Sequence, residues 1–386
     1  MMKGNTHTVG KVTGDLDLSS GQVLQAVGPE GIEIQGTLRC DGDVTVNGSL
    51  QVEDITIDRG KLEVNGSVTA SGEIEADRAE IIVHGDLKAT ELEAGRAVRV
   101  DGSLNVDDVD IGGVLEVGGK TTVKDLDIGG RAELKGQLDA TAVEVGGRIK
   151  LAGGVVHGSI EIGGFIESSG PLTFKSLEAG GKISLGDSAT GETLEVGGAL
   201  TVARDLTLSK SLEVGGIAQV AGTLKVPQLE VGGNIWVGQL EGEEVEVGGV
   251  IRVDRSLKCK TLEVGGRMEA DTAEVSERAE IGAKVQTQKG FKAAELEIGR
   301  HAVVEGPIVG RDVELGPHSR VEDVWAENLR IERGVRARNI YASKITAEGG
   351  LRVEGVILYL QEAKLSEGSK LDKEPQRVTQ LPPPPL

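Results

Sequence analysis

Residues 212–233 read LEVGGIAQVAGTLKVPQLEVGG, so the motif Leu-Glu-Val-Gly-Gly occurs twice, ending first at Gly216 and then at Gly233. The motif, or a close variant, recurs at nearly constant spacing through the middle of the chain. Its last residue is in turn Gly113, Gly130, Gly147, Gly164, Gly181, Gly198, Gly216, Gly233, Gly249 and Gly266. Degenerate copies extend the same phase in both directions, from about Val9 to about Leu360. A fixed period of about 17 residues indicates a repeat architecture.

Each repeat has the pattern of short strands separated by glycine corners. Apolar and polar residues alternate, as at Leu194, Val196 and Leu200, which is the two-residue period of half-buried strands. We expect doublets such as Gly197–Gly198 to supply the positive φ of a tight corner. One repeat cannot bury its own strands, so successive repeats must stack with their strands parallel. The sequence therefore predicts an all-β fold, a single-stranded parallel β-solenoid of about 20 three-sided coils.

Composition agrees with a narrow repeat. The chain of 386 residues holds 58 glycines, but its aromatic residues are only 2 Trp, 2 Tyr and 3 Phe. Collagen is excluded because glycine does not recur at every third position, and disorder is excluded because Val, Ile and Leu are regularly spaced. We expect a thin aliphatic interior without room for rings. The predicted organisation is a short tail over 1–8, a solenoid rod over 9–361 and a disordered polar and proline-rich tail over 362–386.

Bulk charge and cysteine content exclude several classes of function. The net charge of −20 argues against nucleic-acid binding, which needs clustered Lys and Arg. Cys40 and Cys259 are far apart in the chain and show neither a disulfide framework nor zinc-ligand spacing, so a reduced cytoplasmic compartment is expected. No run of about 18 apolar residues suggests a membrane span, and membrane association is not evident. The glycine doublets lack the Lys-Ser or Lys-Thr of a phosphate loop. We expect no enzyme, catalytic residue, cofactor or metal.

The run from Gly36 to Ala89, GTLRCDGDVTVNGSLQVEDITIDRGKLEVNGSVTASGEIEADRAEIIVHGDLKA, resembles the bactofilins, which are polymer-forming cytoskeletal proteins built on a β-helix. The resemblance lies in the recurrent V-x-G-x-L/V-x-V pattern with charged corners. It implies assembly end to end into filaments without nucleotide, and a role as a scaffold that localises partners. In that family the β-helix usually covers about a hundred residues, whereas here the repeats occupy nearly the whole chain.

Alignment of the repeats produces an acidic stripe, defined by the residue between the two apolar positions of the motif. Its fourteen members are Glu93, Asp110, Asp127, Glu144, Glu161, Glu178, Glu195, Glu213, Glu230, Glu246, Glu263, Glu280, Glu297 and Glu314. One interpretation is that these exposed side chains splay, pair with neighbouring Lys or Arg and discourage aggregation. The alternative is that the stripe binds divalent cations or a basic segment of a partner, which would make the chain a monomeric binding module.

Two of the five histidines share a position in the repeat. His301 and His318 fall at equivalent corners of successive repeats, so they should stack on neighbouring coils as an exposed pair. A metal normally needs three or four protein ligands, so a pair alone supports at most a weak metal or pH-sensitive site. The region from Ile298 to Val321 also resembles the hexapeptide acyltransferases in its spelling, and an enzyme of that type is the third functional hypothesis.

The two ends of the repeat array are the predicted polymerisation surfaces, because a terminal coil leaves a strand edge and an apolar cross-section unpaired. The expected interface residues are Val9, Val12, Leu16, Leu18, Val356, Ile357, Leu358, Tyr359 and Leu360. At the C-terminal end the alternative is a plug that closes the core. We therefore expect the principal partner of the chain to be another copy of itself.

The last residues read LPPPPL, which cannot join a strand and should form an extended polyproline segment. It is either a simple disordered tail or a docking peptide for a partner with an aromatic-lined groove. In the second case Pro382, Pro383, Pro384 and Pro385 would carry the contact.

Overall fold

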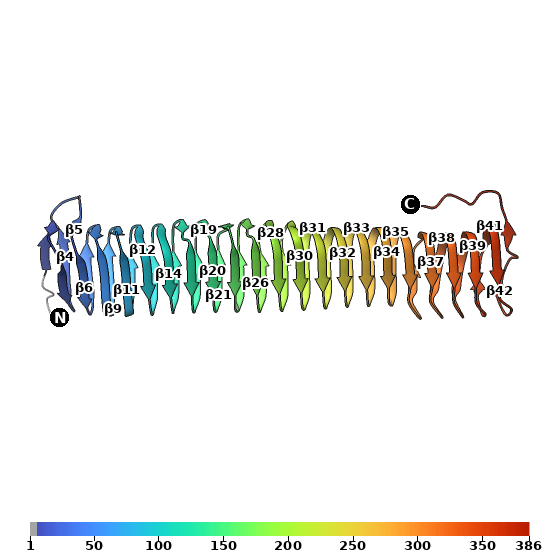
Figure 1. The fold of residues 1–386 in the computed structure, drawn as a ribbon, viewed down its shortest axis with the longest axis horizontal. Helices are drawn as coiled ribbons and strands as arrows, with labels where there is room; N and C mark the ends of the chain where they lie inside the picture. The colour runs from blue at the N-terminus through green and yellow to red at the C-terminus, as the bar shows by residue number, and fades with distance from the viewer. Residues whose placement is uncertain (1–5, 386) are drawn as a thin grey trace. The chain divides into compact units, whose positions relative to one another are not determined.

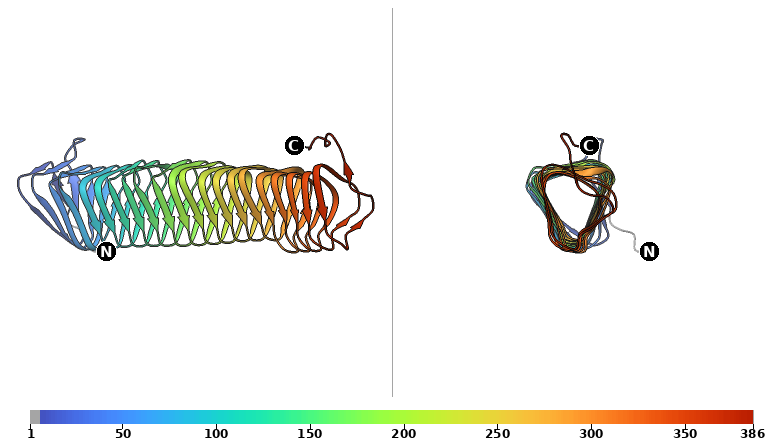
Figure 2. Two further views of the ribbon diagram at one scale, coloured as in Figure 1. Left: turned by 45° about the vertical axis from the view of Figure 1, so that its right-hand side comes forward. Right: turned by 90° about the vertical axis from the view of Figure 1, so that its right-hand side faces the viewer.

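The computed structural model describes residues 6–385, and all its regular structure in that range is β-strand. The chain divides into two compact units, Met1–Val196 and Gly197–Leu386, which are described separately. In each unit the chain winds in a coil, and strands that are one coil apart lie side by side (Figure 1). The end-on view in Figure 2 shows that the coils have three sides.

The strands of the first unit are β1 (Thr6–Val9), β2 (Lys11–Val12), β3 (Leu16–Ser19), β4 (Gln22–Ala26), β5 (Ile32–Ile34), β6 (Thr37–Asp41), β7 (Val44–Asn47), β8 (Leu50–Val52), β9 (Asp54–Asn65), β10 (Val68–Ala70), β11 (Glu73–Val83), β12 (Leu87–Ala94), β13 (Ala97–Val100), β14 (Leu104–Ile111), β15 (Val114–Val117), β16 (Thr121–Thr122), β17 (Asp125–Ile128), β18 (Arg131–Leu134), β19 (Leu138–Ala140), β20 (Ala142–Val145), β21 (Arg148–Leu151), β22 (Gly154–Val156), β23 (Ser159–Ile162), β24 (Phe165–Ser168), β25 (Leu172–Thr173), β26 (Ser176–Ala179), β27 (Lys182–Leu185) and β28 (Ala189–Val196).

The strands of the second unit are β29 (Ala199–Val202), β30 (Leu206–Val214), β31 (Ile217–Val231), β32 (Asn234–Val247), β33 (Val250–Val264), β34 (Arg267–Ile281), β35 (Lys284–Ile298), β36 (Val303–Glu305), β37 (Ile308–Leu315), β38 (Arg320–Ile331), β39 (Arg336–Ala347), β40 (Arg352–Val353), β41 (Ile357–Leu365), β42 (Lys370–Leu371) and β43 (Gln376–Arg377).

The repeat period appears directly in the strand pairing, and every pairing is parallel. In the first unit, one residue from each side shows the register: Leu115 pairs with Ala132, Thr121 with Leu138, and Asp127 with Glu144. Each partner lies one motif repeat further along the chain. The predicted fold class is therefore confirmed as a parallel β-solenoid, with about 22 turns.

The core is a set of aliphatic columns. In β17, Leu126 and Ile128 point inward and are buried, whereas Asp127 between them is exposed. The constant register places Val143 and Val145 of β20 directly on that buried pair. Parallel pairing thus stacks like on like, and the alternation read from the sequence becomes a continuous interior in each unit.

The glycine doublets have a different role from the predicted one. We compared the motif doublets from Gly112–Gly113 to Gly265–Gly266. Every glycine of these doublets whose environment is described has a φ outside the left-handed region. At Gly147, a Cβ would lie 2.2 Å from the carbonyl oxygen of Gly130, one coil earlier. The doublets are needed because successive coils approach too closely for any side chain, so the expectation of positive φ was wrong. Positive φ occurs at other corners, including Gly334 and Gly350.

The interior also accommodates two rings, contrary to the expectation that none would fit. Phe174 and Phe291 are buried with exposed fractions of 4% and 0%. A small residue in an adjacent coil makes the space. Gly191 lies beside the ring of Phe174, where a Cβ would come within 2.2 Å of Cε2, and Ala273 is the ladder partner of Phe291.

The expected N-terminal boundary differs slightly from the structure. Residues 6–8, assigned to a tail, belong to β1, which pairs with β4; residues 1–5 lie outside the described range. The first coils are also longer than the motif repeats, because Leu16 does not meet its ladder partner until Leu38. The extra length includes an exposed loop after β4, where Val27 has an exposed fraction of 68%.

The expected C-terminal boundary at residue 361 was wrong. β41 continues to Leu365, which pairs with Ala347, and β42 adds the pair Val353–Leu371. Apolar residues at alternate positions allow these segments to extend the ladder by part of another coil. Residues 362–377, expected to be disordered, therefore belong largely to the solenoid.

Candidate functional site

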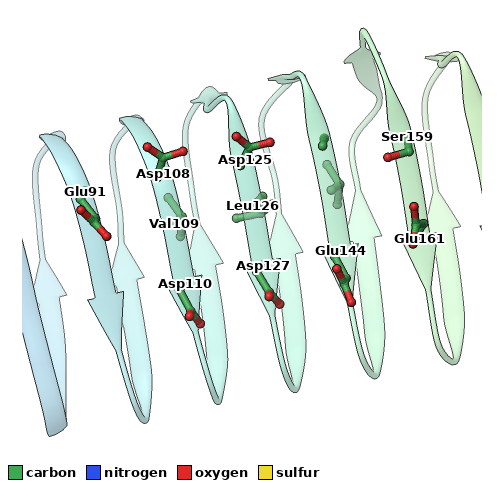
Figure 3. A pocket seen from close by; sticks show the side chains of 12 residues that line it. Glu91, Asp108, Val109, Asp110, Asp125, Leu126, Asp127, Glu144, Ser159 and Glu161 are labelled. Carbon is green, nitrogen blue, oxygen red and sulfur yellow. The ribbon is translucent and has the colours of Figure 1, made fainter.

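The acidic stripe occupies the centre of one side of the coils. In the first unit, ladder pairing joins Glu93 to Asp110, Asp110 to Asp127, and so on through Glu195. All seven side chains are exposed, because each lies between two inward-pointing apolar residues of its strand. The predicted alignment of these residues is therefore present. Figure 3 shows Asp110, Asp127, Glu144 and Glu161 on neighbouring strands.

A second acidic column runs beside this part of the stripe. Glu91 pairs with Asp108, and Asp108 with Asp125, each two positions before a member of the stripe. The acidic column ends there, because the ladder partner of Asp125 is Ala142 on β20, and Ser159 on β23 lines the groove beyond it. The two columns line one open groove over β12, β14, β17, β20 and β23 (Figure 3). Sequence reasoning missed the second column, although the same alignment of repeats contains it.

The stripe carboxylates of the first unit form no ion pair with other described residues of that unit. Among residues 6–196, no Lys, Arg or His lies within ion-pair distance of a stripe residue. The mutual effect is visible at the edge of the same side, where burial and then the charges of Glu91, Glu75 and Glu93 raise the pKa of Glu73. Like charges on paired residues of adjacent strands destabilise a sheet unless an external cation or basic group neutralises them.

In the second unit the stripe changes from unpaired to paired. Its members from Glu213 to Glu314 are again in ladder register. Arg278 lies 3.5 Å from Glu280 and 3.0 Å from Glu297. Arg330 is the ladder partner of Glu314 and lies 3.5 Å from it. The expected pairing with basic neighbours therefore occurs at this last stretch, but at no member from Glu213 to Glu263 in the described structure.

The structure brings His301 and His318 together as expected. Their rings stack with centroids 5.1 Å apart and planes 11° from parallel. Both adopt positive φ, 58° and 62°, at the corner where the next two coils carry Gly334 and Gly350. Over residues 6–385, no cluster of three or more His, Cys, Asp or Glu side chains is arranged to hold a metal ion.

A third histidine makes stronger polar contacts. His84 lies 2.7 Å from Asp101 through Nδ1 and 3.4 Å from Glu63 through Nε2. These hydrogen bonds, that of Asp101 first, raise the pKa of His84. Asp101 also accepts a hydrogen bond from Arg99 at 2.9 Å. The cluster is exposed on the surface and forms a local polar network between neighbouring coils.

The predicted polymerisation residues lie in two different situations. At the N-terminal side, Val9, Val12 and Leu16 are half-buried and only Leu18 is buried. β1 is bonded to β4 along one edge, and its other edge has no strand partner among the described residues.

At the C-terminal side, the run from Val356 to Leu360 is not the last part of the ladder. Ile357 is buried and the other four residues are half-buried. β43 pairs over the run, joining Leu358 to Gln376 and Tyr359 to Arg377. Beyond this run, Leu365 and Leu371 also occupy inward positions, and both are half-buried.

The proline-rich segment lies against its own solenoid. Trp325 Nε1 donates a hydrogen bond of 3.1 Å to the backbone oxygen of Pro382, and Leu381 and Pro382 are half-buried. The Trp325 ring stacks on that of Tyr341, with centroids 4.7 Å apart. The end of the chain can be followed back along the second unit in Figures 1 and 2. The segment was expected to be free or bound to a partner; Leu386 lies outside the described residues.

Comparisons with known proteins identify no relative. No protein-family model matches the chain, and neither the curated proteins nor the solved structures gave a match. Across residues 6–385 no helix is long and apolar enough to traverse a bilayer.

Proposed function

We propose that the chain is a structural protein that associates end to end with copies of itself and serves as a scaffold. The observation that carries the proposal is the first described coil, in which β1 uses one edge only while Val9, Val12 and Leu16 remain half-exposed. Val12 and Leu16 have the ladder partners Ile34 and Leu38 in the next coil, and both partners are buried. The resemblance of residues 36–89 to the bactofilins supports the same function.

The physical basis is the incomplete pairing of a terminal strand. Its free N–H and C=O groups and its exposed apolar residues gain partners if a second parallel ladder is added. At the other side, β42 and β43 are each paired along one edge, and Leu365 and Leu371 are half-buried. A contact between two unlike ends is heterologous, and such a contact can propagate into a filament without nucleotide.

Substitution of an apolar residue by aspartate at each end of the solenoid tests the proposal. Leu16→Asp and, separately, Leu371→Asp should reduce association, because each places a carboxylate at the apolar surface that would be covered. Ile217→Asp is the matched control, since Ile217 is 46% exposed on an outward position of β31. Sedimentation velocity over a range of concentrations and negative-stain microscopy measure the result, with circular dichroism as the check of folding. A wild-type protein that stays monomeric, or end variants that polymerise normally, would refute the proposal.

The second candidate function is recruitment of a basic ligand by the acidic side of the first unit. It is favoured by the stripe carboxylates there, which have no Lys, Arg or His within ion-pair distance among residues 6–196, and by the second column of Glu91, Asp108 and Asp125. Basic side chains spaced along an extended peptide would neutralise the carboxylates of the acidic stripe in successive coils. This function does not require self-association.

The test removes three charges from the stripe with Asp110→Asn, Glu144→Gln and Glu178→Gln. The matched control removes three from another side of the same region with Glu116→Gln, Glu133→Gln and Glu167→Gln, which are paired with Arg131 or Lys150. A labelled octalysine peptide is titrated at two salt concentrations and followed by anisotropy. A specific site predicts weaker binding in the stripe variant than in the control. Equal weakening would mean that only the net charge matters.

A further inference from the structure

In the second unit, one column of outward-pointing ladder partners, here called the outward lane, changes from charged to apolar residues along its length. Over five successive strands the lane alternates in charge, and Lys225–Glu241 and Lys258–Glu274 form ion pairs of 3.6 and 3.4 Å. Over the next four it is apolar. In ladder order the residues are Lys225, Glu241, Lys258, Glu274, Lys292, Val309, Trp325, Tyr341 and Leu358. The last four are here called the apolar strip.

The apolar strip lies where the end of the chain returns. All four of its residues are half-buried, although their side chains point away from the core. Part of the cover comes from the Leu381–Pro385 segment, whose Pro382 oxygen accepts the hydrogen bond from the Trp325 indole. The tail runs back over this end of the second unit in Figure 1.

The corner before the two aromatic residues is held by a polar network. Asp323 accepts hydrogen bonds from Arg338 Nε at 2.9 Å and from Asn339 Nδ2 at 2.8 Å. Asn339 Oδ1 in turn accepts the amide of Val356 at 3.0 Å. These contacts tie together the strands that carry Trp325 and Tyr341, so the stacked rings are presented on a fixed surface.

Stacked rings with an outward N–H donor suit a polyproline ligand. A polyproline II segment has no internal hydrogen bonds, so its carbonyl groups are free to accept, and its rings pack on aromatic surfaces with little loss of chain entropy. Tryptophan supplies both the apolar face and the donor. We propose that the apolar strip is a polyproline-binding site, and that its ligand is the chain's own Leu381–Pro385 segment.

Occupation in cis has a consequence for other ligands. A segment tethered to its site competes at an effective concentration on the order of millimolar. A proline-rich segment from elsewhere would therefore reach the apolar strip only after the tethered segment leaves. For the same reason a partner could bind Pro382–Pro385 only when the segment is released.

The first experiment releases the segment in the full-length chain. Residues 381–385 are changed to Ser-Gly-Ser-Gly-Ser in a Trp236→Phe background, which leaves Trp325 as the only tryptophan. Acrylamide should then quench Trp325 more strongly than in the Trp236→Phe chain with its natural segment. The peptide TQLPPPPL should reverse the increase, whereas TQLAAAAL should not. Unchanged quenching on release, or equal protection by both peptides, would overturn the proposal.

The second experiment measures binding of fluorescein-labelled TQLPPPPL by anisotropy; the reference chain carries the Ser-Gly-Ser-Gly-Ser replacement of residues 381–385 but retains Trp236. Trp325→Phe keeps a ring but removes the indole donor, and we expect about fivefold weaker binding, equivalent to about 1 kcal/mol for one hydrogen bond. Tyr341→Ser should weaken binding further, because it removes the stacked partner. Trp236→Phe, on another part of the second unit, is the control and should change nothing. Full affinity in both strip variants would refute the site, and sedimentation of the same proteins reports separately on self-association.

Discussion

Replacing Gly147 with alanine is expected to loosen the coils on either side of it. The new Cβ would lie 2.2 Å from the carbonyl oxygen of Gly130, whereas ordinary contact starts at 3.4 Å. The backbones must therefore separate by about 1 Å, and such overpacking costs about 1 to 3 kcal/mol. That oxygen already accepts the amide of Arg148 at 3.2 Å. Separation also weakens this hydrogen bond, which is worth about 1 kcal/mol.

The unfolded chain offsets part of this cost. Alanine has fewer unfolded conformations than glycine, which stabilises the folded state by about 0.4 to 1 kcal/mol. The net local destabilisation is then about 1 to 3 kcal/mol, or about 5- to 150-fold in an opening equilibrium. Long repeat arrays open locally rather than all at once. Hydrogen exchange followed by mass spectrometry is therefore the assay, read on peptides that cover β18, β20 and β21.

Gly28→Ala is the matched control. Gly28 has no atom within 4 Å of a built Cβ and its φ lies outside the left-handed region, so alanine should be neutral or slightly stabilising there. Faster exchange restricted to the coils around Gly147 would support close coil-to-coil approach as the reason for the doublets. Equal exchange in the two variants would refute it.

Three further outcomes are expected. Burial raises the pKa of the Cys40 and Cys259 thiols to about 12, so neither should react with a thiol reagent at pH 8 until the protein unfolds; rapid native labelling would contradict this. Because the hydrogen bond to Asp101 raises the pKa of His84, its contribution to stability is complete below the unfolded pKa and is lost as pH rises through the folded pKa; Asp101→Asn should lower the pKa of His84 in an NMR titration. Asp127→Asn removes a charge between two like neighbours and should raise the melting temperature slightly, by the equivalent of a few tenths of a kcal/mol, with a smaller gain in high salt.

The repeat made the fold accessible from sequence because parallel pairing at a constant offset converts chain position directly into spatial position. The alignment of Asp110, Asp127 and Glu144, and the stacking of His301 on His318, followed from counting alone. The same counting would have found Trp325 and Tyr341, which are ladder partners in one lane. Sequence reasoning missed them because only the motif's own positions were aligned.

Other errors came from features that the period does not determine. A left-handed corner and a close approach of two backbones both require glycine, so the sequence could not distinguish them at Gly146–Gly147. The contact between Trp325 and Pro382 spans 57 residues and follows no repeat offset. Leu365 and Leu371 were overlooked as core positions because the polar residues around them are typical of a disordered tail.

The constant register also governs how each unit can fold. The entropy lost when a loop closes grows with the logarithm of loop length. In the first unit, each new strand pairs with a strand that ends only about one coil earlier. Leu115, for example, pairs with Ala132, and Ala132 pairs with Ile149. The loop to be closed therefore never lengthens as coils accumulate, and the last coil is no slower to add than an early one. Parallel sheets usually fold slowly because their paired strands are far apart in the sequence. This sheet can instead grow strand by strand in the order in which the chain is synthesised.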